Sequence, residues 1–551
     1  MDLKSYTRGF VALSLFISFS SQVYSIGGRT PLAGSFSKKH TIFQAAPDTL
    51  DKPANVFPGD HNPAHHEEEV EEEGMHIASD HTPAHKIILE ETEIRDLDNI
   101  RNSPDDLSEQ GFHIPRMEIH IDGGAFVTDK KNFLKALIKI DGGGYYPDMT
   151  DSVWIRGRGN STWNADNPHD KNPYRLKFRE KVSPFGLEKG KNWILLTNKQ
   201  RHSMMANAIG MKAARLVRVQ AANHIIPIDL FINGEYRGNY NFTEKVGLAD
   251  NSVKLADQSR AALLELDTYF DETHKFHSNL YNLPVNIKDH HFRKGEKAAM
   301  LDYIQTGFDQ LCFALQNEGK VSHLVDVDQL ARYLMVNELI GNYEIMHPKS
   351  LFLYKEDFTS PDSKFVFGPI WDLNWTFGYE QNRDYGTADP KIDFWNAPAH
   401  FENKRFINDL LFKDKSVYQA YCKVWADFME NHLQELLDYC DVYYQYTKDS
   451  FLKNADKWSD GKDYRTVAQN MKNWLERRAH HIYSRLSSQP TSQGKTSTTG
   501  SIKAYEAPAN RGNVTYTLQG IRIKDQKQGT YSELTPGIYI VGGVKIAVTN
   551  R

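Results

Sequence analysis

The sequence predicts an α+β protein with a two-lobed main domain and a small all-β module near its C-terminal end. Segments that alternate apolar and polar residues dominate between residues 114 and 246, which is typical of half-buried strands. Helical periodicity dominates between residues 296 and 486, and a Ser/Thr-rich stretch with short apolar runs follows. A β-rich part followed by a helical part favours an α+β domain with a site between its lobes.

Composition limits the class of protein. The chain of 551 residues is too long for one hydrophobic core, so two or more folded units are expected. A net charge of -5 provides no basic field that would recruit nucleic acid. The three cysteines exclude a disulfide scaffold and a thiolate zinc cluster. Cys312 is expected in the core, whereas Cys422 and Cys440 either pair or remain buried thiols.

The first 25 residues have the pattern of a secretory signal peptide. Lys4 and Arg8 precede an apolar run from Gly9 to Phe19, and Val23–Ser25 offers a cleavage site with small residues. No later segment approaches the roughly 20 apolar residues that a spanning helix needs. We therefore expect a secreted or cell-surface protein whose mature chain has no transmembrane helix.

Residues 26–112 lack sustained periodicity and predict a mostly disordered polar arm. Within it, Gly59–Lys86 is rich in acidic residues and histidine and contains Asp-His-x-Pro-Ala-His twice, at Asp60–His65 and Asp80–His85. Imidazoles and carboxylates are ligands for zinc, copper or nickel, so metal sequestration is one hypothesis and a solvated acidic arm is the other. A short helix is expected at Lys86–Asn102.

Alternating patterns predict the strands of the first lobe, and one helix interrupts them. The helix is expected from about His202 to Leu216, where Met205, Ile209 and Ala213 recur at helical spacing. Asn233-Gly234 is a strong signal for a hairpin turn. The predicted strands are Met117–Ile121, Leu137–Ile140, Ser152–Arg156, Pro173–Phe178, Lys191–Thr197, Ile226–Ile232 and Arg237–Glu244.

A glycine-containing turn, Arg156-Gly-Arg-Gly-Asn-Ser-Thr-Trp163, follows the third of these strands. Glycines let a backbone approach a phosphate closely, and the polar side chains between them can donate hydrogen bonds. Lys177 lies on the next strand, and a strand lysine beneath a glycine-bearing loop is how protein kinases hold phosphates. The alternative is a tight hairpin with an outward-facing lysine. The candidate donors in the turn are Arg156, Arg158, Asn160 and Ser161.

After Val246 the pattern predicts a chain made mainly of helices. The helix that begins at Val327 has a capping signal, because Asp326 precedes it and Gln329 lies three positions further on. The predicted helices are Glu296–Gln316, Val327–Leu339, Phe406–Leu411, Val417–His432, Leu436–Asp449 and Val467–Leu486.

Two acidic residues bracket a predicted hairpin between these helices. Glu344 lies in the polar loop after the helix that ends at Gly341, and Asp372 follows the second hairpin strand. The hairpin strands are expected at Leu351–Lys355 and Lys364–Ile370. If the two carboxylates converge at the open end, one can orient an acceptor hydroxyl while the other holds Mg²⁺, as in phosphoryl transfer. Two solvated loop carboxylates are the alternative.

Six spaced segments resemble the CotH-type kinases, the spore coat protein H family, over Met117–Leu486: RGRGNSTW, PYRLKF, KNWILLTN, FINGEYRGNYNFTEKV, NELIGN and WDLNWTFG. The resemblance implies an atypical protein-kinase-like fold. It also implies ATP with Mg²⁺ or Mn²⁺, and transfer of the γ-phosphoryl group to Ser or Thr of a protein. Such enzymes act on secreted and surface proteins as well as on spore coats.

The resemblance also assigns roles to individual residues. Lys177 matches the phosphate-binding lysine, and Asp372 matches the metal-binding aspartate, with Asn374 beside it. Glu344 falls where the family has the loop aspartate that faces the acceptor hydroxyl. Glu244 matches a recurrent glutamate with a structural or lysine-orienting role. The nucleotide-side turn is matched by Arg156, Arg158, Asn160 and Ser161.

Several positions depart from the family pattern, among them Gln200–Ala206, where the family often shows Asp and Arg. Glu344 is longer than aspartate by one methylene, and a displacement of ~1 Å can cost on the order of 10²-fold in rate. At Asn374 many members carry a second aspartate, so the metal site has one charge fewer. Lys349 lies in the region where a metal-ligating asparagine is expected.

The sequence thus predicts five regions: a signal peptide at 1–25, an arm at 26–112, a kinase-like domain at 113–486, a linker at 487–503 and a β module at 504–551. Within the last, Gly537–Val548 resembles the C-terminal sorting tails of envelope bacteria, and a module without an address function is the alternative. The leading hypothesis is a secreted or surface Ser/Thr kinase that can also phosphorylate its own linker. The alternative is a surface binding or adhesion protein that kept the fold and lost catalysis.

Overall fold

The computed structural model describes residues 111–198, 204–398, 401–459 and 463–488, together with four short strands between residues 515 and 548. The predicted signal peptide and the predicted arm up to residue 110 lie outside the described residues, as does the linker from residue 489 onward.

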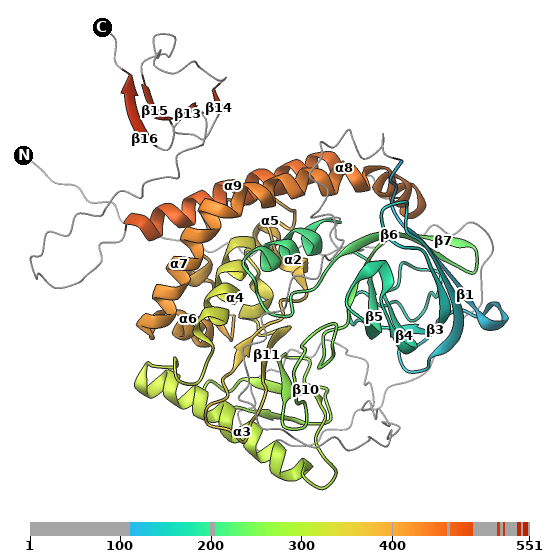
Figure 1. The fold of residues 1–551 in the computed structure, drawn as a ribbon, viewed down its shortest axis with the longest axis horizontal. Coiled ribbons are helices and arrows are strands. Elements are labelled where there is room, and N and C mark those ends of the chain that lie inside the picture. Colours follow the sequence, from blue (N-terminus) through green and yellow to red (C-terminus); the bar gives the residue numbers. More distant parts are fainter. Residues whose placement is uncertain are drawn as a thin grey trace, which may run out of the picture. The chain divides into compact units, whose positions relative to one another are not determined.

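Seven strands of the first lobe form a closed barrel in the order β1-β2-β3-β4-β5-β7-β6 (Figure 1). Neighbouring strands are antiparallel except at the seam, where β1 pairs in parallel with β6 and Arg116 lies opposite Asp229. The strands are β1 (Arg116–Ile121), β2 (Leu134–Asp141), β3 (Met149–Gly157), β4 (Tyr174–Val182), β5 (Gly190–Leu196), β6 (Ile226–Ile232) and β7 (Glu235–Glu244).

Alternation along these strands separates the interior of the barrel from its outer face. Inward-facing apolar side chains such as Ile138, Ile155 and Leu176 are fully buried and belong to one core. On β4, Leu176 and Phe178 point inward, so Lys177 between them points outward and is exposed. The period-2 pattern therefore predicted these strands correctly, with ends that differ by a few residues.

A second sheet of five strands, in the order β12-β11-β8-β10-β9, follows the barrel in sequence. The shift to helices comes later than expected, because three strands lie between Val246 and the next helix. Every residue of β8 is buried, so this strand shows no alternation that would reveal it. The strands are β8 (Ala262–Leu266), β9 (Lys275–His277), β10 (Pro284–His290), β11 (Leu351–Lys355) and β12 (Val366–Phe367).

Helices make up most of the rest of the described chain. Asp326 caps α4 as expected, since its carboxylate accepts a hydrogen bond from the backbone N–H of Gln329 at 3.1 Å. A π-helical turn, Ala314–Glu318, extends α3. The helices are α2 (Ala206–Leu216), α3 (Lys297–Phe313), α4 (Val327–Ile340), α5 (Tyr379–Asn382), α6 (Lys404–Phe412), α7 (Lys415–Asn431), α8 (Leu433–Trp458) and α9 (Tyr464–Ser488).

Polar contacts join α8 to the barrel. Asn454 Oδ1 accepts hydrogen bonds from Lys171 Nζ at 2.7 Å and from the backbone N–H of Asn239 at 3.1 Å. Ser450 accepts a hydrogen bond from the Asn239 amide and donates one to Asp229. These hydrogen bonds pair buried polar groups across the contact between the barrel and the helix, and Asn239 Oδ1 is left without a partner.

Four strands near the C-terminal end form a separate antiparallel sheet in the order β14-β13-β15-β16. Its strands are β13 (Thr515–Thr517), β14 (Arg522–Ile523), β15 (Gly537–Val541) and β16 (Val544–Val548). Short strands were expected in this region of the sequence, and four are present among the described residues.

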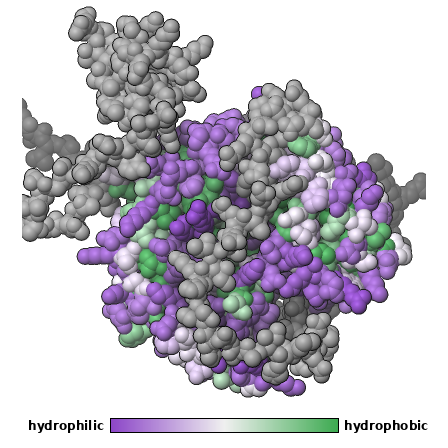
Figure 2. All heavy atoms as spheres, viewed as in Figure 1, coloured by the Kyte–Doolittle hydropathy of each residue, from purple (hydrophilic) through white to green (hydrophobic). Residues whose placement is uncertain are grey.

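The surface and the cysteines of the described part agree with the composition. On the face shown in Figure 2, hydrophobic residues lie in small patches separated by hydrophilic ones. Among the helices of the described ranges, none is long and apolar enough to cross a membrane. Cys312, Cys422 and Cys440 are all free thiols.

Candidate active site

The loop that carries Glu344 is fixed by the end of α4. Gly341 terminates the helix in the left-handed conformation, with φ of 61°. Asn342 then caps the 3₁₀ helix η6 (Tyr343–Met346), because its side-chain oxygen accepts the backbone N–H of Glu344 at 3.2 Å. Glu344 is only 7% exposed, so this carboxylate is held inside the loop, contrary to the solvated alternative.

Asp372 lies at the start of a second 3₁₀ helix, η7 (Leu373–Trp375), which contacts η6. Its backbone has φ of 55°, a left-handed conformation that aspartate tolerates better than most residues. The amide nitrogen of Asn374 donates a hydrogen bond to Asp372 Oδ1 at 2.6 Å. The contact between η6 and η7 brings together the two helices that carry Glu344 and Asp372.

Arg158, in the turn after β3, lies within electrostatic range of Asp372. Burial lowers the pKa of Arg158, while the charges of Asp372 and Glu265 raise it. Its guanidinium also lies 5.8 Å from the ring centroid of Trp371, the residue before Asp372. Arg158 therefore supplies positive charge close to Asp372.

The five-stranded sheet adds acidic groups that the sequence analysis did not single out. Glu265, on β8, pairs with Lys288 Nζ on β10 at 2.8 Å, and Lys288 also pairs with Glu272 at 2.9 Å. Asp267 accepts backbone N–H groups of Tyr269 at 2.7 Å and Ser350 at 3.2 Å. The available signal was the pair of acids within the apolar run Leu263-Leu-Glu-Leu-Asp267, which lies in the region expected to be helical.

Burial and the neighbouring charge of Glu265 raise the pKa of Asp267 to about 7, although two backbone N–H groups and Lys288 act in the opposite direction. The carboxyl of Asp267 therefore titrates near neutral pH. A shift of this kind at a cluster of charged groups is typical of functional sites, and structural networks also produce it.

The glycine-containing turn is braced by Lys130. Its ammonium group donates to the backbone oxygen of Gly159 at 3.1 Å and to Asn160 Oδ1 at 3.5 Å. Gly159 has φ of 83°, and a Cβ there would lie 2.6 Å from the Thr162 hydroxyl, so the turn requires glycine. Asn160 and Ser161 are exposed, as phosphate donors would need to be.

Two of the predicted basic residues lie on the barrel strands β3 and β4. Arg156 donates to the backbone oxygen of Lys130 at 2.8 Å and lies over the ring of Phe133. Lys177 is exposed on the outer face of β4, opposite Trp154 and Asn192 of the adjacent strands.

Arg175, two residues before Lys177, is the residue of β4 that acts on Arg158 electrostatically. It is largely buried and donates to Asn192 Oδ1 at 3.0 Å. Sequence reasoning missed Arg175 because it and Lys177 share a face of the strand, and only the lysine matched the kinase pattern.

Glu244 has a structural environment. It is buried, and its carboxylate accepts the backbone N–H of His224 at 2.9 Å while the His224 ring nitrogen lies 2.6 Å from the other oxygen. Burial raises the pKa of Glu244, but the charge and hydrogen bonds of His224 outweigh it, so the pKa is lowered. Of its two expected roles, these contacts support the structural one.

A divalent cation is implied by the family, and the residues present fit one that takes most ligands from phosphates and water. Asp372 offers a carboxylate. Asn374 directs its amide nitrogen to that carboxylate, so here it orients Asp372. Within the described ranges, no group of three or more His, Cys, Asp or Glu side chains could hold a metal ion by itself.

Comparison with known protein families identifies the family of the chain. The family model described as CotH kinase protein matches residues 155–482, a span that includes the turn with Arg158, the acids of β8, Glu344 and Asp372. No curated protein matches the chain. Because the matched span covers more than half of the chain, the protein belongs to the CotH kinase family, which implies a kinase-like fold and the use of ATP.

Proposed function

We propose that the chain is an atypical protein kinase that transfers the γ-phosphoryl group of ATP to Ser or Thr of a protein. The observation that carries the proposal is the contact between η6 and η7, which brings the buried Glu344 loop to Asp372 opposite Arg158. This arrangement has the parts that phosphoryl transfer requires: an acid for the acceptor, an acid for the metal and a cation for the phosphates.

In this proposal Asp372 holds a divalent cation, Mg²⁺ or Mn²⁺, together with the nucleotide phosphates, and Asn374 keeps its carboxylate oriented. Such a cation, when bound, neutralises charge on the phosphates. Arg158 and the turn with Asn160 and Ser161 contact the phosphates. Glu344 orients the acceptor hydroxyl and accepts its proton.

A second candidate function is a kinase-like binding protein without catalysis. Glu344 in place of aspartate favours it, because a buried loop leaves the longer side chain little freedom to correct its position. The signal-peptide pattern supports a secreted or surface location for either function.

The test is transfer of label from γ-labelled ATP with Mg²⁺ or Mn²⁺ to a Ser/Thr-rich protein and to the chain itself. Asp372→Asn is the informative variant, since asparagine tolerates the left-handed backbone and removes only the charge. Asp362→Asn, at the exposed turn of the same hairpin, is the matched control. We expect transfer by the wild type and the control, with a loss on the order of 10³-fold in Asp372→Asn.

Mass spectrometry of the labelled chain should find phosphate on Ser or Thr of residues 487–503 if the linker is a substrate. Absence of transfer by the wild type, with ATP binding retained, would favour the binding protein. Equal transfer by wild type and Asp372→Asn would show that the assigned site is wrong.

A further inference from the structure

The outer face of the barrel carries positive charge that the proposed reaction does not use. Strands β2, β3 and β4 pair side by side, so their outward side chains form rows across this face. In the first row Lys135 lies opposite Trp154, and Trp154 lies opposite Lys177. Both lysines are exposed, and the indole between them is half-buried. The first row therefore has an aromatic centre between two cations.

A second row of like charges lies beside the first. Arg156 of β3 is directly opposite Arg175 of β4, and their guanidiniums lie 4.8 and 5.8 Å from the ring centroid of Phe133. Further along β4, the side chain of Arg179 is 84% exposed. Like charges opposite one another on a sheet face destabilise the sheet. An anionic partner on this face would relieve that repulsion.

Acidic side chains around the two rows have other partners. Asp129 accepts two backbone N–H groups of its own loop, both at 2.7 Å. Glu118 on β1 lies 2.6 Å from Arg116, and Glu180 lies 3.9 Å from Arg179. Among the described residues, neither lysine of the first row forms an ion pair with an acid.

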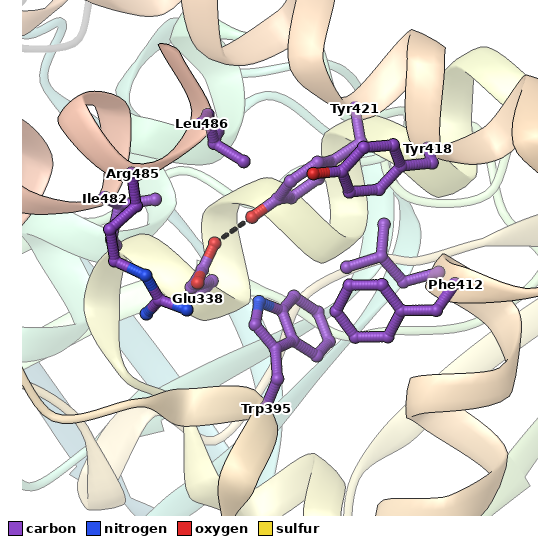
Figure 3. Close-up of a pocket in the computed structure, with 9 residues that line it drawn as sticks. Glu338, Trp395, Phe412, Tyr418, Tyr421, Ile482, Arg485 and Leu486 are labelled. Carbon is purple, nitrogen blue, oxygen red and sulfur yellow. Dashed lines mark hydrogen bonds between the residues drawn. The ribbon is translucent and has the colours of Figure 1, made fainter. Parts of the chain in front are cut away.

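A pocket among the helices shows the opposite case (Figure 3). Its volume is only about 60 Å³, and its acid, Glu338, accepts a hydrogen bond from the Tyr421 hydroxyl. Burial raises the pKa of Glu338, while the charges of Arg478 and Arg485 and the hydrogen bonds of Tyr421 and Trp395 oppose the rise. The charge of Glu338 is thus compensated within the fold, whereas the charges of the first row are not.

The sequence contains a segment whose charge pattern complements the first row. Glu67–Glu73, which lies outside the described residues, has six glutamates around Val70. In an extended chain successive side chains point to opposite sides, so Glu68, Val70 and Glu72 share one side. That side has an apolar centre between two anions.

The length of the chain allows this segment to reach the barrel face. The 37 residues numbered 74 to 110 separate it from the described chain and span up to roughly 120 Å when extended. The chain then enters β1, which pairs with β2, the strand that carries Lys135. A tether of this kind gives a local concentration on the order of millimolar, at which weak ion pairs suffice for docking.

We propose that Glu67–Glu73 docks on the outer face of β2, β3 and β4, with its glutamates at Lys135 and Lys177 and with Val70 at Trp154. A segment of the same chain is the occupant because both its charge pattern and its tether fit the face. The contact is electrostatic and exposed, so salt weakens it.

The experiment cross-links the full chain with a carbodiimide, which joins a carboxylate to a lysine amine in contact with it. Mass spectrometry then maps the links in the monomeric fraction. We expect links from Glu67–Glu73 to Lys135 and Lys177 at 50 mM salt. At 500 mM salt they should fall at least about fivefold, because the Debye length shrinks to about 4 Å.

Charge reversal separates docking on this face from general attraction. In Lys177→Glu the links to Lys135 should fall about fivefold, since a repulsive charge enters the row. Lys423→Glu, at an exposed position of α7, changes the net charge equally and should leave the links unchanged. Glu68→Gln combined with Glu72→Gln leaves the barrel untouched and should weaken the links of the remaining glutamates. Thermal melting of each variant separates loss of docking from loss of the fold.

Three results would overturn the proposal. Absence of links from Glu67–Glu73 to either lysine at low salt would exclude docking on this face. Equal loss of links in Lys177→Glu and Lys423→Glu would reduce the contact to non-specific attraction. Links found only between isotopically distinct chains in a mixture would assign the face to a second copy. None of these results depends on whether the chain transfers phosphate.

Discussion

The barrel side and the sheet side of the candidate site compensate their charges in different ways. On the barrel side, the buried Glu244 has its own partner in His224, and its pKa is lowered. On the sheet side, Glu265 shares Lys288 with Glu272, and Asp267 has a pKa raised to about 7 by burial and by Glu265.

The difference distinguishes a structural carboxylate, Glu244, from the carboxylates beside the candidate site. A carboxylate with a dedicated partner gains its full stabilisation when the protein folds, whereas carboxylates that share one cation remain under-compensated. Arg158 is the residue that joins the two sides, because it belongs to the barrel and is attracted by Asp372 and Glu265. A ligand that brings cations would compensate the acidic charge on the sheet side and leave the charge balance of the barrel side unchanged.

Among the variants that test this comparison, the largest effect is expected from Arg158→Met, which removes the cation attracted by Asp372 and Glu265. Label transfer from ATP should fall on the order of 10²-fold, since a charge that faces the developing phosphoryl transition state is lost. ATP affinity, followed with a fluorescent nucleotide analogue, should fall with it. Unchanged label transfer in Arg158→Met would show that Arg158 is not part of the active site. It would also show that Arg158 does not link the barrel side to the sheet side.

The next largest effect is expected in the pH dependence of the free energy of unfolding, which Asp267 should influence. Its folded pKa of about 7 exceeds the unfolded value of 3.8, so between these values the folded chain binds more protons than the unfolded chain. This stabilising contribution is fully present below about pH 3.8 and is lost as pH rises to about 7. A shift of this size corresponds to at most ~4 kcal/mol, and we expect about 3 kcal/mol.

Asp267→Asn should abolish this dependence, as measured by denaturant unfolding of the wild type and the variant at a series of pH values. The two proteins should differ most in slope between pH 4 and 7. If the free energies of unfolding of the two proteins changed with pH in parallel, the charge of Asp267 would be compensated as fully as that of Glu244.

Glu244→Gln tests the barrel side. Loss of a buried, charge-assisted hydrogen bond should lower the free energy of unfolding by about 2 kcal/mol near neutral pH. Because the pKa of Glu244 is lowered, its stabilisation is present above the unfolded pKa and is lost as pH falls through the folded one, so the two proteins should converge in acid. A large loss of ATP affinity without loss of stability would instead make Glu244 part of the site.

The smallest effect is expected from Lys177→Met. Lys177 is exposed on the outer face of β4, where a single lysine changes stability and ligand affinity little. ATP affinity should stay within about twofold of the wild type. Arg175→Met serves as its matched comparison on the same face, and a stronger effect of Lys177→Met than of Arg175→Met would restore the lysine to the phosphate site.

Periodicity predicted the part of the fold in which one strand face is buried. The barrel strands and α4 with its Asp326 cap follow from local patterns. Strand β8 does not, because all its residues are buried and its apolar run carries Glu265 without alternation. That one omission removed both sheet-side acids from the predicted site.

Within the candidate site, the sequence identified the acids that flank the hairpin but not the pairs that form across the chain. Glu344 and Asp372 are brought together by local structure, a helix end and a strand end. The partners Glu244–His224 and Glu265–Lys288 come from separate strands or loops, so only the pairing of strands reveals them. The function of the predicted site residues stays a prediction.

The parallel seam between β1 and β6 also sets an order of events during folding. The other barrel strands pair with partners closer in sequence, β5 and β7 being the most distant of these pairs, but one edge of β1 must wait for a strand that is synthesised more than 100 residues later. Loop-closure entropy makes such long-range pairing slow. The barrel can close only when β7, which lies between β5 and β6, is also complete. A chain still emerging from the ribosome therefore carries an open sheet with exposed edges until Glu244 is free, and this interval is when the barrel is most prone to aggregate.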